Sequence, residues 1–262
     1  MQDDLIVKVY KSLSVERFQP YRVDSDTTLK PALARYLWNV ALCEALYPSL
    51  NTVEVLLRNS LNDFFTRMYG TPLWFTHLNI RPHQEKTVRE TVKYLIERKK
   101  ITIPSLPLNS PAEQRAFKSL TFEKLLSTLN TETMPGMIVA AMPFGFWTAF
   151  FHSDFEGFWR KHPKLFQVFP YFRDRPYGDL LRKPLDKRFL AIREQLRNRV
   201  FHHEPIWNQR ILYRNYEKVN DVIYWINPEK YAILKLVDRF PQVYEQGWQY
   251  YEGLLERVQF TE

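Results

Sequence analysis

The sequence predicts an all-α protein, and three observations support this fold class. Glycine is scarce, with 7 glycines among 262 residues, which is about 3% against the usual ~7%. Sandwiches and barrels use glycine in tight hairpin turns, so its scarcity argues against them. Apolar residues recur at helical spacing in two long segments, and the 45% hydrophobic residues suffice for a globular core.

The N-terminal residues are the least helical part of this prediction. Residues 1–28 are expected to form an N-terminal arm. Apolar and polar residues weakly alternate at Leu5–Tyr10, so a short strand there is the alternative. A helix from about residue 29 to 46 follows. It is expected to end at Tyr47, because the proline at position 48 disfavours helical backbone in the residue before it.

The next helix is marked more clearly. Asn51 or Thr52 can cap its start, and Gly70 closes it. Its apolar residues follow the helical period: Val53, Leu56, Leu57, Leu61, Phe64, Phe65 and Met68. On this helix Glu54 and Arg58 are four residues apart, and they are either a surface ion pair or supporting residues of a polar site.

The middle of the chain is expected to contain a less regular insertion near residues 71–118, which includes a proline-containing loop at 103–111. A second proline-containing loop is expected after residue 160, and it continues through Pro184. Helices are expected near residues 84–100, 120–129, 135–151 (bent or broken at Pro143) and 155–160.

A long helix is expected over residues 185–203, where Pro205 stops it. Its apolar residues step by four, three, four and four: Leu185, Phe189, Ile192, Leu196 and Val200. Three helices follow, near residues 210–224, 228–239 and 243–258. Because no linker interrupts the pattern, residues 29–262 are expected to form a single helical domain.

The positive charge is concentrated in one segment. The net charge is +8, and between Arg160 and Arg199 there are 12 Lys/Arg against 4 Asp/Glu, whereas the rest of the chain is neutral. Such a patch attracts polyanions, RNA among them, or forms a solvated face. The residues expected to contact RNA are Arg173, Arg175, Arg182, Lys183, Lys187, Arg193 and Arg199, with stacking rings at Tyr171, Phe172 and Tyr177.

The basic segment ends in a polar motif that includes Arg197, Asn198, His202 and His203. On an ideal helix Asn198 and His202 share a face, as do Arg199 and His203. Arg197 lies about 140° from His202 on the same wheel. The two could act together through a long side chain, a local distortion of the helix, or a second subunit.

These residue types suit the cleavage of RNA without a metal. Histidine can move a proton to or from a ribose hydroxyl, arginine holds phosphate, and asparagine can orient either one. The alternative is a helix C-terminal cap, where His and Arg are also favoured. A single cysteine excludes a Cys-cluster metal site and His202-His203-Glu204-Pro205 lacks the HExxH spacing, so we expect no metal and no cofactor.

Three segments in order carry a resemblance to a known family. Arg197-Asn198-x-x-x-His202 resembles the R-x(4–6)-H signature of the HEPN superfamily (higher eukaryotes and prokaryotes nucleotide-binding domains). The run Leu196–Ile206 is similar to the Abi-like abortive-infection proteins of bacteria (AbiD/AbiF type). Two further segments share that similarity, which covers roughly residues 30–210: Leu37-Trp38 through Glu54-x-x-x-Arg58-Asn59, and Pro143-Phe-Gly-Phe-Trp147.

The resemblance implies a HEPN-like helical bundle with additional helices and a metal-independent endoribonuclease that acts as an anti-phage toxin. Arg197 and His202 would be the catalytic pair, with Asn198 beside the arginine and His203 assisting or replacing His202. A homodimer would join the motifs of two protomers in one composite site. Implied partners are RNA, as substrate and as a regulatory small RNA, and an antitoxin.

Two other functions stay open at this point: a non-catalytic protein that binds a structured RNA, and a defence sensor without RNA affinity. The chain begins without the features of a signal peptide, and its longest uncharged apolar run, Met137–Phe151, is shorter than the roughly 20 residues that span a membrane. We therefore expect a cytoplasmic protein with no membrane partner, and the resemblance implies that it is bacterial.

Overall fold

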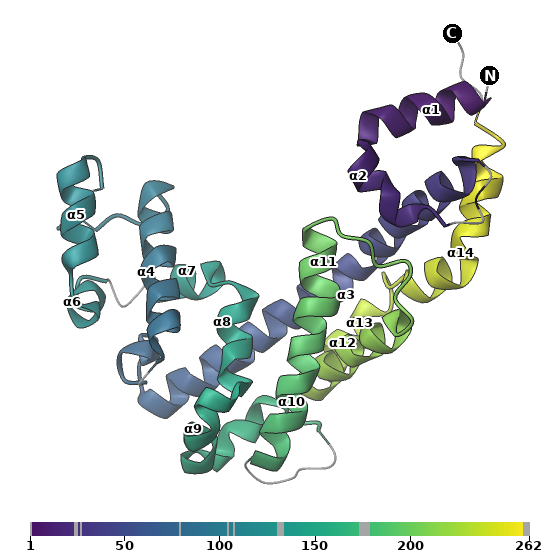
Figure 1. The fold of residues 1–262 in the computed structure, drawn as a ribbon. Coiled ribbons are helices and arrows are strands. Elements are labelled where there is room, and N and C mark those ends of the chain that lie inside the picture. The colour runs from purple at the N-terminus through teal and green to yellow at the C-terminus, as the bar shows by residue number, and fades with distance from the viewer. Residues whose placement is uncertain are drawn as a thin grey trace. The chain divides into compact units, whose positions relative to one another are not determined.

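The computed structural model describes residues 2–23, 26, 28–78, 80–103, 105–106, 108–129, 134–172 and 179–258. Within these residues every regular element is helical, so the predicted all-α class is confirmed. The helices are α1 (Gln2–Leu13), α2 (Val15–Phe18), α3 (Lys30–Tyr69), α4 (Pro82–Glu97), α5 (Pro111–Ser119), α6 (Phe122–Ser127), α7 (Met134–Ala141), α8 (Phe144–Thr148), α9 (Glu156–Lys161), α10 (Asp179–Ala191), α11 (Asn198–Phe201), α12 (Leu212–Ile226), α13 (Pro228–Leu234) and α14 (Phe240–Leu255) (Figure 1).

The chain divides into two compact units, where the sequence predicted one domain over residues 29–262. Unit 1 comprises Met1–Val53 and Lys187–Glu262, and unit 2 comprises Glu54–Asp186. Unit 1 therefore contains α1, α2, the first part of α3 and the helices from the end of α10 onward. Unit 2 contains the rest of α3, the helices α4 to α9 and the first part of α10.

A strand at Leu5–Tyr10, the alternative considered for the N-terminal residues, is wrong. Residues 2–18 form α1 and α2, and a 3-10 turn continues to Tyr21. Ile6, Phe18 and Tyr21 are buried against the start of α3. Ile6, Val9, Tyr10 and Leu13 of α1 are three, four and seven residues apart, and they pack in this cluster. A helix places them on one face, whereas a strand would divide them between two faces.

The predicted break at Pro48 is also wrong, because α3 continues through this proline to Tyr69. A proline inside a helix removes one hydrogen bond and crowds the preceding turn, at a cost of about 3 kcal/mol. Burial of the apolar face on both sides of Pro48 offsets this cost, at Leu42, Leu46, Leu50, Val53, Leu57 and Leu61. The predicted closure at Gly70 is confirmed, since its φ of 67° is the left-handed conformation of a helix C-cap.

α3 is long and apolar enough to cross a membrane, and α7 with α8 would pass the same test as one bent span. The core helix of a soluble protein meets these criteria too. α3 also carries Arg35 and Asn39, which are buried and bonded to neighbouring segments of unit 1. We therefore describe α3 as a core helix.

Prolines and caps explain the other boundaries. The chain turns by 91° between α7 and the segment Phe144–Phe151, which confirms the predicted break at Pro143. Within the expected insertion, α5 begins at a capping box in which Ser110 and Glu113 each bond the other's backbone N–H. The loop predicted through Pro184 is wrong, because α10 begins at Asp179 and includes this proline.

A buried ion pair joins four segments of unit 1. The Arg35 guanidinium makes two hydrogen bonds to the Asp26 carboxylate, of 2.6 and 3.0 Å, and one of 3.0 Å to the carbonyl of Tyr21. Its Cζ lies 4.6 Å from the ring centre of Trp248 on α14 and 5.6 Å from that of Trp207. The side chains of Arg35 and Asp26 are 7% and 4% exposed, so the pair is largely removed from water.

The variant Asp26→Asn is expected to lower the free energy of unfolding by about 3–5 kcal/mol at pH 7, because it leaves a buried guanidinium without its counter-charge. Hydrogen bonds from Arg35 hold the pKa of Asp26 below its ordinary value. The stability from the pair is therefore fully present above that ordinary value and is lost as the pH falls through the lowered pKa. Urea denaturation of both proteins from pH 7 to pH 3 measures the difference.

The control is Glu44→Gln, which removes an exposed partner of Arg239 in the same unit and should cost no more than about 1 kcal/mol. A gap of less than 1 kcal/mol between wild type and Asp26→Asn at neutral pH, or a gap that stays constant into acid, contradicts the assigned role of the pair.

Candidate functional site

The Arg/His motif lies where a π-helical turn passes into the last turn of a helix. Residues Ile192–Arg197 form the π turn, and the Asn198 N–H donates to the carbonyl of Arg193, five residues back. A π turn holds an extra residue and so changes the direction in which the following side chains point. A local distortion is therefore present, but it ends at Arg197, so the backbone from Asn198 to His202 keeps α-helical spacing.

The motif helix ends in a Schellman turn. The Glu204 N–H donates to the Arg199 carbonyl at 2.8 Å, and the His203 N–H donates to the Val200 carbonyl at 3.3 Å. His203 has a φ of 59°, the left-handed conformation usually given to glycine. It therefore does not share a helical face with Arg199, contrary to the prediction from the wheel.

His202 keeps its predicted relation to Asn198. Its N–H donates to the Asn198 carbonyl at 2.8 Å, so these two residues are one helical turn apart. The Asn198 side-chain amide donates to Glu194 at 3.3 Å. A hydrogen bond from Arg193, with that from Asn198 adding to it, holds the pKa of Glu194 below its ordinary value. Asn198 is thus oriented by a carboxylate.

The Arg197 guanidinium stacks on an exposed ring. Its Cζ lies 4.8 Å from the ring centre of Phe201, one turn further along the chain. Phe201 is 42% exposed and also contacts Tyr47 of α3, at 5.9 Å between ring centres. Both motif histidines are exposed and Arg197 is half-buried. The two imidazoles are therefore open to solvent, whereas the Arg197 side chain is open to it only in part, because its Nε is buried.

Sequence reasoning missed the residue that holds the end of this segment. Asn39 of α3 is 4% exposed, and its Oδ1 accepts hydrogen bonds from the backbone N–H groups of Ile206 (2.7 Å) and Trp207 (3.2 Å). The signal was a pair of polar residues, Arg35 and Asn39, four apart in the largely apolar first part of the helix, residues 31–46. Two such residues on one face indicate buried partners.

The residues expected to contact RNA differ in their exposure and in their partners within the structure. Lys183 and Lys187 are exposed. Arg193 pairs with Glu194 at 2.8 Å, and Arg199 donates to the Pro205 carbonyl at 3.0 Å within the turn. Tyr171 is 46% exposed. Arg173, Arg175 and Tyr177 lie outside the described residues.

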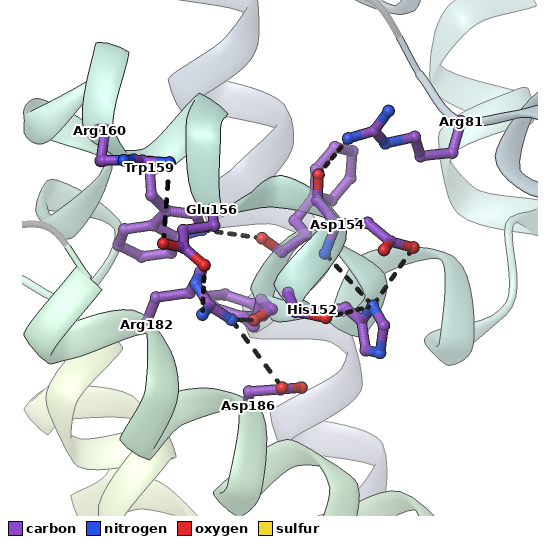
Figure 2. Close-up of polar contacts among 11 residues, drawn as sticks. Arg81, His152, Asp154, Glu156, Trp159, Arg160, Arg182 and Asp186 are labelled. Atoms are coloured by element: carbon purple, nitrogen blue, oxygen red, sulfur yellow. Dashed lines mark hydrogen bonds and ion pairs between the residues drawn. The ribbon is translucent and has the colours of Figure 1, made fainter.

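Arg182 is a correction, because it is 2% exposed and is not presented to a ligand. Its guanidinium donates to the Phe151 carbonyl at 2.9 Å and lies 3.8 Å from Glu156 and 4.0 Å from Asp186. Figure 2 shows Arg182 between these two carboxylates. The surrounding hydrogen bond and charges stabilise the buried guanidinium, which makes Arg182 part of the core of unit 2.

The expected supporting residues Glu54 and Arg58 belong to unit 2. The Arg58 guanidinium donates to the carbonyl of Ala140 on α7 at 3.0 Å. It therefore helps to hold α7 against α3 within unit 2. A role for either residue at the Arg/His motif stays a prediction.

Among the described residues, no group of three or more His, Cys, Asp or Glu side chains lies close enough together to hold a metal ion. The side-chain groups that the motif offers for chemistry are the imidazoles of His202 and His203, the Arg197 guanidinium and the Asn198 amide. No protein-family model, no curated protein and no solved structure matches the chain.

The variant His203→Gly is expected to raise the free energy of unfolding by about 0.5–1 kcal/mol, because glycine adopts a positive φ without the strain of a Cβ. The matched variant His202→Gly, at a residue with φ of −95°, should lower it by about 0.5–1 kcal/mol. Chemical denaturation followed by circular dichroism compares the two. Equal losses of stability in both variants contradict the assigned cap.

The variant Asn39→Ala is expected to destabilise the protein by about 1–3 kcal/mol, because the buried N–H of Ile206 then has no acceptor. Asn208→Ala, at an exposed position near the same turn, should change stability by less than about 0.5 kcal/mol. Hydrogen exchange at Ile206 gives a local measure. An unchanged exchange rate in Asn39→Ala would show that the bond does not hold the turn.

Proposed function

We propose that this chain is an endoribonuclease of the HEPN, Abi-like type that cleaves RNA without a metal. The observation that carries the proposal is the exposed His202, which is one turn from Asn198 and follows, in sequence, the Phe201 on whose ring Arg197 stacks. An exposed imidazole and a partly exposed guanidinium within six residues suit proton transfer next to a bound phosphate.

The proposed reaction uses the ribose as its own nucleophile. The 2′-hydroxyl gives its proton to an imidazole while its oxygen bonds to the adjacent phosphorus. The bond from phosphorus to the 5′-oxygen breaks, and that oxygen takes up a proton. The products are a 2′,3′-cyclic phosphate and a 5′-hydroxyl. Arg197 would stabilise the charge that develops on the phosphoryl oxygens.

One imidazole cannot be both base and acid in a single concerted step. The second proton carrier would be His203, or an imidazole from a second copy of the chain. We propose the second copy, which places Arg197 of one protomer beside His202 of the other. Exposed apolar side chains around the motif support an interface there: Tyr47 at 51%, Phe201 at 42% and Val237 at 58%. Tyr47 and Val237 line one hollow of unit 1.

The charge around the motif suits an RNA partner. Residues 187–199 carry five Lys/Arg and one Glu, and this potential would raise the local concentration of RNA. The biological role that we propose, a cytoplasmic toxin in bacterial defence against phage that is restrained by an antitoxin or a small RNA, rests on the resemblance of the motif segments.

The purified protein is expected to cut labelled single-stranded RNA in excess EDTA. His202→Ala should reduce the rate by at least about 100-fold, because proton transfer by a positioned side chain contributes about 10²–10⁴-fold. His203→Gly separates the roles of the two histidines, because it removes the imidazole and keeps the turn. His83→Ala, at an exposed position on α4, is the matched control and should cleave like wild type.

Activity that vanishes with EDTA, or that survives His202→Ala together with His203→Gly, contradicts this mechanism. Salt-dependent RNA binding without any cleavage by wild type would favour the non-catalytic RNA-binding function instead. No affinity for RNA at all would favour a protein sensor, and the ratio of absorbance at 260 and 280 nm of the purified protein distinguishes these two outcomes.

A further inference from the structure

A second basic surface lies in unit 2, and it is not part of the Arg/His motif. Two adjoining hollows share Lys161 and His162, and the first has a volume of about 520 Å³, within the range of roughly 300–1,000 Å³ typical of small-molecule sites. We call this first cavity the Lys161 hollow. It is lined by Phe64, Arg67, Met68, Lys161, His162, Pro163, Lys164 and Gln167.

The cations of the Lys161 hollow come from three different elements. Arg67 belongs to α3, Lys161 ends α9, and Lys164 lies on the 3-10 turn that follows. Among the residues that the structure describes, no Asp or Glu lines the hollow. In the part of the chain that the structure describes, no ion pair involves any of these three residues. Their positive charge is therefore available to an anionic ligand.

The nearest carboxylate in the adjoining hollow is directed elsewhere. Asp154 interacts with the imidazole of His152 at 3.3 Å, and Arg81 donates to the Asp154 backbone carbonyl (Figure 2). Arg160, next to Lys161 in sequence, pairs with Glu156 at 3.7 Å. Asp154 and Glu156 thus interact with other side chains, and within the described residues neither pairs with a cation of the Lys161 hollow.

Aromatic and apolar side chains also line the hollow, among them Phe64 and Met68, which form its apolar wall. His162 packs on Phe158 with 4.3 Å between ring centres. Burial lowers the pKa of His162, and the nearby Lys161 lowers it further, so this ring is neutral at pH 7 and can both donate and accept hydrogen bonds. With the apolar wall of Phe64 and Met68 and the amide of Gln167, the hollow offers a surface for a flat, polar-edged ring beside its cations.

We propose that the Lys161 hollow binds a phosphorylated nucleotide, either free or as one residue of a single-stranded RNA. Lys161, Lys164 and Arg67 hold the phosphate, and the base lies against the apolar wall. If the nucleotide belongs to an RNA strand, the proposal rests on the proposed function, because the hollow is then a second binding site for the substrate. If the nucleotide is free, the proposal does not depend on RNA cleavage.

The test measures binding to the full chain carrying His202→Ala, so that RNA stays intact. The probes are adenosine, AMP, ATP and a fluorescein-labelled single-stranded RNA of ten nucleotides. The double variant Lys161→Ala/Lys164→Ala is compared with Lys86→Ala/Arg160→Ala, which removes two exposed, ion-paired cations of unit 2 outside the hollow. All four substituted side chains are exposed, and thermal melts check that each variant is folded.

The Lys161/Lys164 variant should lose at least 10-fold in affinity for the probe that binds, whereas the matched variant stays within 2-fold. AMP should bind more tightly than adenosine. For RNA the salt dependence of log K should become shallower by about 1.4, as expected for two lost phosphate contacts. Saturable binding of AMP or ATP identifies a free nucleotide, and binding of RNA alone identifies a strand.

The proposal is overturned if none of the probes binds saturably, or if the two double variants weaken binding equally. A wild-type protein that does not cut RNA, but whose nucleotide binding depends on Lys161 and Lys164, would contradict the ribonuclease proposal. The Lys161 hollow would then still be a nucleotide-binding site.

Discussion

The arrangement of the motif segment depends on two buried polar side chains of α3. Asn39 accepts the backbone N–H groups of Ile206 and Trp207, and Arg35, one turn earlier, packs on the ring of Trp207 while it pairs with Asp26. These contacts hold the backbone of the segment that follows the Schellman turn, at Ile206 and Trp207, against α3. A left-handed residue such as His203 persists only where the surrounding structure holds it. The polar face of α3 therefore determines how the motif is presented.

The same contacts explain why the motif can be both ordered and exposed. The Arg/His segment lies at a helix end, where backbone carbonyls need partners and side chains reach solvent. Backbone bonds from His203 and Glu204 satisfy those carbonyls, which leaves the imidazoles free of a structural task. The π turn before Arg197 changes the direction of the following side chains without ending the helix.

Sequence patterns predicted the helical class, the break at Pro143 and the closure at Gly70, because local backbone preferences decide these features. They failed at Pro48, where burial along α3 outweighs the local cost of a proline. They also failed at Arg182, because the carbonyl of Phe151 that it binds is 31 residues away. The left-handed backbone of His203 could not be predicted from spacing either, because the Schellman turn and the contacts of Asn39 on α3 with Ile206 and Trp207 hold it.

The central claim is that the ribose 2′-hydroxyl attacks the phosphorus at a site made by His202 and Arg197. The most direct measurement uses an RNA whose cleaved nucleotide carries a 2′-O-methyl group, with the products of the unmodified RNA identified by mass spectrometry. The account predicts a 2′,3′-cyclic phosphate from the unmodified RNA and no cut at the methylated nucleotide. Cleavage that continues at the methylated nucleotide, or products that end in a 5′-phosphate, would contradict it.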